Sequence, residues 1–260
     1  MVIADCANHR IIRWKIGDMS GQVVAGGRGN GNQFDQLCCP SDMLVDDETN
    51  SLIICDRKNR RVVRWPQSCD TTQGEVLLDN ITCRGLAMDD QRYLYISDSD
   101  NDEVRRYQIG DKNGILIAGG HGKGDGFSQL DEPTYVFVDR QQTIYVSDCN
   151  NHRVMKWDKG ATEGTVIAGG QGEGIGLKQL WYPQGLFVDT SGTLYVADSW
   201  NDRVMCWPKG AKQGTVIVGG NGEGERANQL NNPIGVFLDR YGHLYVVDRN
   251  NCRVQRFSFE

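Results

Sequence analysis

Six aspartates recur along the chain, and an asparagine follows each of them three positions later. The pairs are Asp5 and Asn8, Asp56 and Asn59, Asp98 and Asn101, Asp148 and Asn151, Asp198 and Asn201, and Asp248 and Asn251. Carboxylates gathered in one place can bind calcium or act as acids and bases in catalysis. A ligand site occurs once in a domain, however, whereas a turn occurs once in every repeat. Because short polar side chains hydrogen-bond to the backbone of turns, we interpret these as structural turn residues.

In five of the six copies an arginine follows the asparagine by two positions and begins the next predicted strand. These arginines are Arg10, Arg61, Arg153, Arg203 and Arg253. Each lies within reach of the aspartate, and a charge-assisted hydrogen bond contributes about 1.5–3 kcal/mol. The third copy has Glu103 at this position, so we expect any ion pair to be lost or rearranged there.

Four glycine-rich segments look superficially like loops that bind phosphate. They lie at 26–31, 119–126, 169–176 and 219–224. Phosphate binding requires a helix that starts directly after the loop and directs its amides at the anion. Here a Gln-Leu pair and a strand pattern follow, and Asp125, Glu173 and Glu223 would repel a phosphate. We therefore expect loops whose glycines permit positive φ, with no nucleotide and no other cofactor.

The elements that position these residues follow from a repeat in the sequence. One segment, typified by YVSDCNNHRVMKW, occurs at 2–14, 53–65, 95–107, 145–157, 195–207 and 245–257. Its aspartates are 51, 42, 50, 50 and 50 residues apart. A β-branched run that ends in glycines occurs at 23–27, 115–120, 166–170 and 216–220, with a degenerate copy at 76–80. A run that ends in aspartate occurs at 42–46, 85–89, 135–139, 185–189 and 235–239.

Each strand-like piece of this repeat is short, rich in Val, Ile, Leu and Tyr, and bounded by Gly, Asn or Asp. These are strand and turn signals, and no stretch keeps the apolar spacing of a helix. Four antiparallel strands in about fifty residues make a propeller blade. The six aspartates therefore predict an all-β chain with six four-stranded antiparallel blades, which is a six-bladed β-propeller.

The strand types are not equally frequent. The tyrosine-rich and Arg/Trp strands occur six times, whereas the strands that end in Gly-Gly or in Asp occur five times each. We therefore expect the propeller to lack one outer and one inner strand, about 33 residues of the period. We interpret residues 1–260 as a single propeller domain truncated at its N-terminus, with a leader or a further domain lost upstream of Met1. The alternative is a ring that tolerates the gap and keeps unpaired strand edges.

The turn segments resemble the NHL repeat. Asn8-His9-Arg10-Ile11 and Asn151-His152-Arg153-Val154 match its Asn-His-Arg motif best, and a leucine follows downstream. The resemblance covers nearly the whole chain and implies a six-bladed propeller that offers a surface to protein or RNA partners. In some RING/B-box ubiquitin ligases such a propeller lies at the C-terminal end. A related propeller family carries a zinc-dependent amidating lyase.

A lyase of that kind would need three imidazoles that converge on zinc. Of the four histidines, His9 and His152 occupy the same repeat position three blades apart, on opposite sides of a six-bladed ring. His121 lies in a glycine loop and His243 precedes a tyrosine-rich strand, which places these two on opposite faces. The sequence also has no Gly-x-Ser-x-Gly nucleophile motif. We therefore predict no metal site, name no catalytic residue, and favour a protein that is not an enzyme.

The nine cysteines leave the redox state open. Cys55 occupies a position that is Ala, Ser or Val in the other repeats, so we expect a small buried residue. A Cys69–Cys83 bridge and a Cys39–Cys83 bridge are both compatible with the predicted blades, and reduced thiols are the alternative. Asn80-Ile81-Thr82 is a glycosylation sequon, which matters only if the protein is secreted. The chain shows neither a signal peptide nor a transmembrane segment, so the localisation stays open.

We expect the binding face of the propeller to be the mouth of its central channel. The glycine loops and the Asp/Asn turns share that face, and their sequences vary between blades more than the strands do. Tyr182 contributes aromatic surface there. The other candidate binding residues form a basic cluster, an aromatic group and the starts of inner strands: Arg57, Lys58, Arg60, Arg84, Tyr135, Trp181, Gln184 and Trp200.

The chain carries 28 basic and 34 acidic residues, a formal charge of −6, so its overall field does not favour polyanions in general. We predict a non-catalytic interaction scaffold that binds a protein or peptide partner on the channel-mouth face. One alternative is an RNA-binding propeller or the substrate-recognition part of a ubiquitin ligase, and RNA would need the basic residues near Arg57 and Arg84. The other alternative is a metal-dependent propeller enzyme that resembles the lyase.

Overall fold

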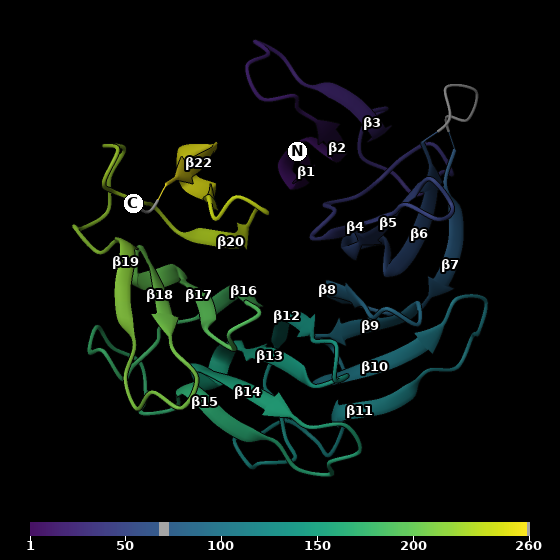
Figure 1. Cartoon of the computed structure of the whole chain (residues 1–260). Helices are drawn as coiled ribbons and strands as arrows, with labels where there is room; N and C mark the ends of the chain where they lie inside the picture. Colours follow the sequence, from purple (N-terminus) through teal and green to yellow (C-terminus); the bar gives the residue numbers. More distant parts are fainter. Residues whose placement is uncertain (68–72, 259–260) are drawn as a thin grey trace. The chain divides into compact units, whose positions relative to one another are not determined.

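The computed structural model describes residues 1–67 and 73–258, which form six antiparallel β-sheets. Each sheet is one blade of a six-bladed β-propeller, as the repeat predicts (Figure 1). The helices among these residues are five 3₁₀ helices of three residues each. The chain divides into two compact units: unit 1 contains Met1–Asp100 and Arg105–Ile115, and unit 2 contains Asn101–Val104 and Leu116–Glu260.

Unit 1 contains the first two blades and most of the third. The first blade comprises β1 (Val2–Asp5), η1 (Cys6–Asn8), β2 (Arg10–Arg13) and β3 (Gln22–Gly26). The second comprises β4 (Met43–Asp46), β5 (Ser51–Asp56), η2 (Arg57–Asn59), β6 (Arg61–Pro66) and β7 (Glu75–Asp79). The third comprises β8 (Cys83–Met88), β9 (Tyr93–Asp98), β10 (Glu103–Gln108) and β11 (Ile115–Gly119), of which the last two cross the boundary between the units.

Unit 2 contains the remaining three blades. The fourth comprises β12 (Pro133–Val138), β13 (Ile144–Asp148), η3 (Cys149–Asn151), β14 (Arg153–Trp157) and β15 (Thr165–Gly169). The fifth comprises β16 (Pro183–Val188), β17 (Leu194–Asp198), η4 (Ser199–Asn201), β18 (Arg203–Trp207) and β19 (Thr215–Gly219). The sixth comprises β20 (Pro233–Leu238), β21 (Leu244–Asp248), η5 (Arg249–Asn251) and β22 (Arg253–Phe257).

Two of the six blades have three strands, and the other four have four. The first blade, β1-β2-β3, has no inner strand among the described residues. The last blade, β20-β21-β22, has no outer strand among them. The predicted shortage of one inner and one outer strand is therefore confirmed.

The strands are rich in apolar residues, because packing between consecutive blades buries both faces of a strand. Every residue of β5 is buried, which is typical of a strand covered on both faces. Within each unit, side chains of consecutive blades form common cores, such as the cluster of Ile54, Leu52 and Ile11 in unit 1 and that of Val196, Leu194 and Val154 in unit 2. The aromatic residues at or next to the ends of the Arg/Trp strands in the four-stranded blades are buried: Trp65, Tyr107, Trp157 and Trp207.

Two disulfides connect consecutive blades within unit 1. Cys6 in η1 is bonded to Cys39, which precedes β4, and Cys55 on β5 is bonded to Cys83 at the start of β8. The Cys39–Cys83 alternative is therefore wrong, because β5 packs against β8 and brings Cys55 to Cys83. The Cys69–Cys83 alternative involves Cys69, which lies outside the described residues. Cys55 is buried, as the sequence predicts.

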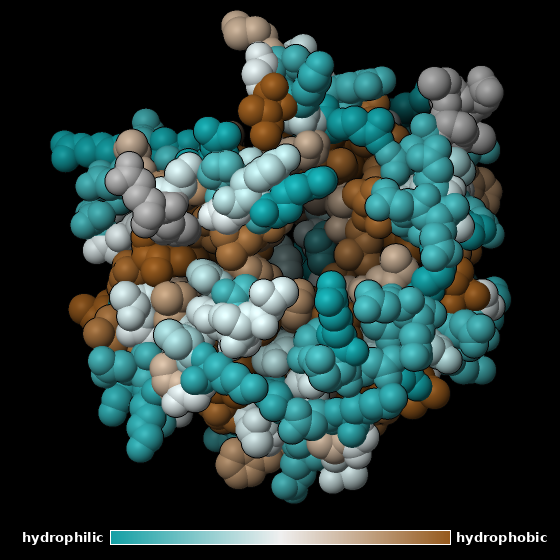
Figure 2. All heavy atoms as spheres, in the orientation of Figure 1, coloured by the Kyte–Doolittle hydropathy of each residue, from teal (hydrophilic) through white to brown (hydrophobic). Residues whose placement is uncertain are grey.

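The surface is mostly polar. Figure 2 shows hydrophilic side chains over much of the visible face, with separate hydrophobic patches between them. Large apolar or aromatic side chains that are strongly exposed include Met19, Ile175, Trp200 and Tyr241. No helix in residues 1–67 and 73–258 has the length and the apolar composition needed to cross a membrane.

Candidate functional site

The recurring Asp-x-x-Asn-x-Arg residues form a hydrogen-bonded unit, seen clearly in the fourth blade. Asp148 is buried, and its Oδ2 accepts bonds from Asn151 Nδ2 at 2.8 Å and from Arg153 Nε at 2.6 Å. Its Oδ1 accepts a bond from the backbone N–H of Asp131 at 2.7 Å. Burial raises the pKa of Asp148, while these hydrogen bonds and the Arg153 charge oppose the rise. The same contacts from asparagine and arginine occur at Asp5, Asp56, Asp198 and Asp248.

The arginine of this unit also holds a glycine loop. Arg153 donates to the carbonyl oxygens of Asp125, Gly126 and Gln129 at 2.6, 3.0 and 3.2 Å. Arg61, Arg203 and Arg253 contact the corresponding loops in the same way. The loops therefore owe their shape to an ion pair inside the blade.

The turn of the third blade is different. Glu103 begins β10 in place of the arginine and is buried. The backbone N–H of Asp100 donates to Asp98 Oδ1 at 3.2 Å, and Asn101 lies in the same turn. The described residues of this turn form no 3₁₀ helix, unlike those of the other five blades.

The histidine rings of the two best NHL-like motifs accept hydrogen bonds from backbone N–H groups. His9 Nδ1 accepts the N–H of Cys39 at 3.0 Å, and His152 Nδ1 accepts the N–H of Tyr182 at 3.2 Å. Both histidines have left-handed backbone conformations, with φ of 54° and 52°. Asp102 and Asp202 occupy the same repeat position and accept the equivalent N–H groups. Sequence reasoning missed this role, although the alternation of His and Asp at one position is its signal.

Within residues 1–67 and 73–258, no three His, Cys, Asp or Glu side chains form a possible metal site. His243 Nδ1 lies 2.9 Å from Asp239 Oδ2 in a turn of the sixth blade. This pair belongs to a repeated turn, because Asp239 Oδ1 also accepts the backbone N–H groups of Tyr241 and His243.

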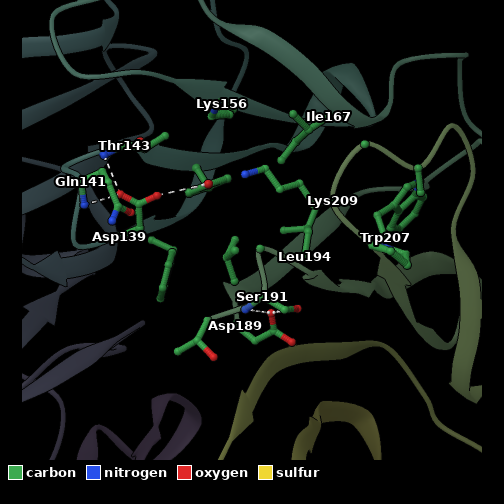
Figure 3. Close-up of a pocket in the computed structure, with 18 of the residues that line it drawn as sticks. Asp139, Gln141, Thr143, Lys156, Ile167, Asp189, Ser191, Leu194, Trp207 and Lys209 are labelled. Atoms are coloured by element: carbon green, nitrogen blue, oxygen red, sulfur yellow. Dashed lines mark hydrogen bonds between the residues drawn. The ribbon is translucent and has the colours of Figure 1, made fainter.

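A cavity of about 1030 Å³ lies between the fourth and fifth blades of unit 2. Figure 3 shows Lys209 reaching into it, with Asp139 and Asp189 at its borders. Tyr145 donates a hydrogen bond to Asp139 Oδ2 at 3.3 Å, and burial followed by the Asp139 charge raises the pKa of Tyr145 to about 12. Burial opposes ionisation of Asp189, but hydrogen bonds from Ser191 and the following backbone outweigh it and lower its pKa.

Both carboxylates in this cavity anchor turns. Asp139 Oδ1 accepts the N–H groups of Gln141 and Thr143, each at 2.9 Å, and Asp189 binds its own turn in the same way. Asp239 of the sixth blade accepts backbone N–H groups of its turn in the same way. The lining groups therefore resemble those of an ordinary gap between blades, and we do not take the cavity as the candidate site.

The predicted basic cluster lies in the second and third blades of unit 1. Arg57 and Lys58 belong to η2, Arg60 follows it, and Arg84 is half-buried on β8. Arg60 forms an ion pair with Asp100 and donates to Thr82 Oγ1. Hydrogen bonds from Thr82 and Arg60 lower the pKa of Asp100. Asp100 thus compensates part of the positive charge, which sequence reasoning did not anticipate.

The predicted aromatic residues of unit 2 lie in contact with one another. The ring centroid of Trp200 lies 5.5 Å from that of Trp181 and 4.9 Å from that of Tyr182. His152 packs edge-on against Tyr182 at 4.8 Å. Trp200 remains 57% exposed. We call the surface formed by His152, Trp181, Tyr182 and Trp200 the aromatic surface.

Backbone hydrogen bonds fix the aromatic surface. The N–H of Trp181 donates to the buried carboxylate of Asp198 at 2.6 Å, and the N–H of Trp200 donates to the carbonyl oxygen of Trp181 at 3.2 Å. The indole Nε1 of Trp181 is buried and has no hydrogen-bond acceptor within the described part of the chain. The turn residues therefore hold two tryptophans together that are distant in sequence.

The other predicted binding residues lie beside this surface or in another blade. Gln184 is half-buried on β16, and its Nε2 lies 3.0 Å from the Sγ of Cys149. Tyr135 is half-buried on β12 of the fourth blade. Burial lowers the pKa of His152, while the nearby carboxylates, Glu173 foremost, oppose this effect. Glu173 Oε2 lies 3.8 Å from His152 Nε2 and marks an acidic border.

Comparison with known proteins identifies the repeat. The family model described as the NHL repeat matches residues 180–207 and 230–257, which span the fifth and sixth blades from before their inner strands to the ends of β18 and β22. No curated protein sequence matches the chain.

Several solved structures share the fold. An auxiliary nutrient binding protein from Bacteroides thetaiotaomicron is 17% identical, with a TM-score of 0.74, and the match covers 96% of this chain but only 64% of that one. A chain of a nidogen/laminin complex is 16% identical, with a TM-score of 0.71 and coverage of 96% and 86%. A gluconolactonase from Xanthomonas campestris is 19% identical, with a TM-score of 0.67 and coverage of 98% and 86%. At these identities the likeness concerns the fold alone.

Proposed function

Because this chain is an NHL-repeat β-propeller, we propose that it is a non-catalytic interaction module that binds a protein or peptide partner through the aromatic surface. The observation that supports this proposal most strongly is that Trp200 is exposed to solvent and yet packed against two other rings. Its ring is 57% exposed and yet packs against Trp181 and Tyr182. A large aromatic side chain that is already held in place binds a partner with little further loss of conformational freedom.

The tryptophans and the tyrosine of the aromatic surface do not recur in the other blades, although the blades themselves repeat. Trp200 lies at the third position of the Asp-x-x-Asn turn, and the other five blades have different residues there: Ala7, Lys58, Asp100, Asn150 and Asn250. Residues that maintain the blade recur in every copy, whereas Trp181, Tyr182 and Trp200 occur together in one blade only. This irregularity supports a role in recognition.

The charge around the aromatic surface favours a particular partner chemistry. Glu173 borders the surface and is well exposed, and the whole chain carries a formal charge of −6. Complementary charge increases the association rate and the selectivity of an interface. A peptide segment that presents apolar side chains next to Lys or Arg fits this surface best.

A random-peptide phage library, panned against the folded protein, tests the proposal. The dissociation constants of the selected peptides are then measured for the parent chain and for Trp200→Ala. We expect a loss of about 2 kcal/mol, typical of a hot-spot residue, which is roughly a 30-fold weaker affinity. Tyr241→Ala is the matched control, because Tyr241 is 77% exposed in a different turn and its removal should leave the affinity unchanged.

Two results would contradict this function. One is a panel of peptides whose affinity is the same for the parent chain and for Trp200→Ala while thermal unfolding shows both to be folded. The other is a library that yields no peptide specific for this protein. RNA binding is supported less well, because Arg60 is already paired with Asp100 in the basic cluster.

A further inference from the structure

The sequon Asn80-Ile81-Thr82 lies in the short connection between β7 and β8 of unit 1. Ile81 and Thr82 point into the protein, with 4% and 8% exposure. Asn80 is exposed and has a φ of 56°. The connection thus anchors its last two residues and presents the asparagine to solvent.

The Thr82 and Asn80 side chains of the sequon differ in their hydrogen bonds. Thr82 Oγ1 accepts a hydrogen bond from Arg60 Nη1 at 2.8 Å and donates one to Asp100 Oδ2 at 2.7 Å. Within the described part of the chain, Asn80 Nδ2 makes one long contact of 3.4 Å, with the exposed Asp79 Oδ1. Thr82 is thus held by hydrogen bonds on both sides, whereas the amide nitrogen of Asn80 faces solvent.

The disulfides give an independent indication of the compartment. Cys6–Cys39 and Cys55–Cys83 each join two consecutive blades, and Cys83 directly follows the sequon. Structural disulfides form and persist in oxidising compartments such as the lumen of the secretory pathway. Asparagine-linked glycans are added to Asn-x-Ser/Thr sequons of secreted proteins, and this chain contains one such sequon.

We propose that the chain folds in an oxidising secretory compartment and that Asn80 carries an N-linked glycan. The donor is a lipid-linked oligosaccharide diphosphate, used by the transferase of the cell. The amide Nδ2 forms a bond to the anomeric carbon of the sugar, and the bond from that carbon to the phosphate oxygen breaks. The lipid diphosphate leaves with the electron pair, and the amide nitrogen gives up one proton.

A glycan at this position affects the neighbouring basic cluster. The backbone N–H of Ile81 donates to the carbonyl oxygen of Arg60 at 3.0 Å, so the sugar is attached next to Arg60 and close to η2. A bulky neutral glycan there obstructs the approach of a nucleic acid to Arg57 and Lys58. The glycan therefore counts against RNA as a partner, and this inference stands independently of the proposed peptide-binding function.

The test uses the full chain, expressed with a cleavable secretory leader in a eukaryotic cell line. The purified protein is treated with peptide N-glycosidase and compared by gel mobility and by peptide mass spectrometry. We expect one glycan, whose release converts Asn80 to aspartate. Asn80→Gln should abolish the mobility shift, and Thr82→Ser, which preserves the sequon and the hydroxyl group, should retain it. The same glycopeptide is expected in protein isolated from its natural source.

Three results would overturn the inference. The first is secreted, folded protein in which Asn80 is unmodified. The second is a mobility shift that persists in Asn80→Gln. The third is a peptide map under non-reducing conditions in which Cys6, Cys39, Cys55 and Cys83 are free thiols. If a variant is not secreted, translation in the presence of microsomes measures the modification before folding, and a lack of modification of the parent chain there also refutes the proposal.

Discussion

At the scale of single residues, the buried aspartates of the turns are the most consequential groups. Asp148 has no exposed surface, and Arg153 is the positive charge that compensates it at 2.6 Å. The side chain of Arg153 is itself almost completely buried. Loss of the arginine would leave an uncompensated charge in the interior, which is much more costly than the loss of a pair on the surface.

The first blade provides a matched comparison for this pair. Arg153→Leu should lower the free energy of unfolding by about 3–5 kcal/mol. Arg10→Leu removes the equivalent arginine, but the Arg10 and Asp5 side chains are 35% and 22% exposed, so its cost should stay below about 1 kcal/mol. Urea denaturation of both variants measures the difference. Equal losses would mean that burial does not determine the strength of this contact.

Sequence alone predicts which residues form these turns, but not which residues of other loops and blades they contact. The Asp-x-x-Asn-x-Arg spacing is local, so the contact of Arg153 with Asp148 can be expected from it. The bonds from Arg153 to the carbonyl oxygens of Asp125 and Gly126 span 27–28 residues and depend on the path of a glycine loop. Nor does a sequence tell that His152 accepts the N–H of Tyr182, because that bond joins two blades.

At the scale of the elements, four of the five described outer strands end in a glycine for a steric reason. Gly169 ends β15 with a φ of +69°, and a Cβ atom there would collide with the carbonyl oxygen of His152. Gly172, in the following loop, has a similar φ of +73° but no atom within 4 Å of the Cβ position. Gly172 is therefore required only by its backbone conformation, whereas Gly169 is required by its backbone conformation and by the close packing of its neighbours.

Substitution of these glycines distinguishes the two requirements. Gly172→Ala should cost about 1 kcal/mol, the price of a left-handed backbone for an L-residue. Gly169→Ala carries the same backbone cost and a steric clash, so we expect a loss above about 3 kcal/mol. Thermal unfolding of the two variants is the measurement. If both melt at the same temperature, the contact with His152 does not restrict the position.

The strands themselves were largely predictable, because their signals are local. Alternating β-branched residues and turn residues at fixed offsets give the blade order and the shortage of two strands. The disulfide Cys55–Cys83 could not be deduced, because it depends on how β5 packs against β8. The aromatic surface is an intermediate case. Trp181 and Trp200 were candidates by residue type, but their contact depends on the hydrogen bonds from the Trp181 N–H to Asp198 and from the Trp200 N–H to the Trp181 carbonyl oxygen, which join distant positions in the sequence.

At the scale of the whole molecule, the covalent links are unevenly distributed. The two disulfides among the described residues lie in unit 1, and they join cysteines 33 and 28 positions apart. In unit 2, neither Cys206 on β18 nor Cys252 forms a disulfide with another described residue. We therefore expect the two units to respond differently to reducing conditions.

Reduction should destabilise unit 1 selectively. Each disulfide of this loop length contributes about 3–4 kcal/mol, so hydrogen exchange in residues 1–67 should accelerate when a reductant is added. Residues 116–258 should exchange at an unchanged rate, since local stability differs between cooperative units. Cys206→Ser is the control and should not alter either rate. A uniform acceleration over the whole chain would contradict this assignment.

The two three-stranded blades have a consequence for how the protein behaves in solution. Among the described residues, β1 pairs with β2 alone and β22 with β21 alone, whereas the corresponding strands of the four-stranded blades pair on both sides. Each therefore presents a row of amide and carbonyl groups that serves as a template for a foreign strand. Where no further segment covers these edges, we expect strand exchange between molecules to start there, and its extent should rise with protein concentration.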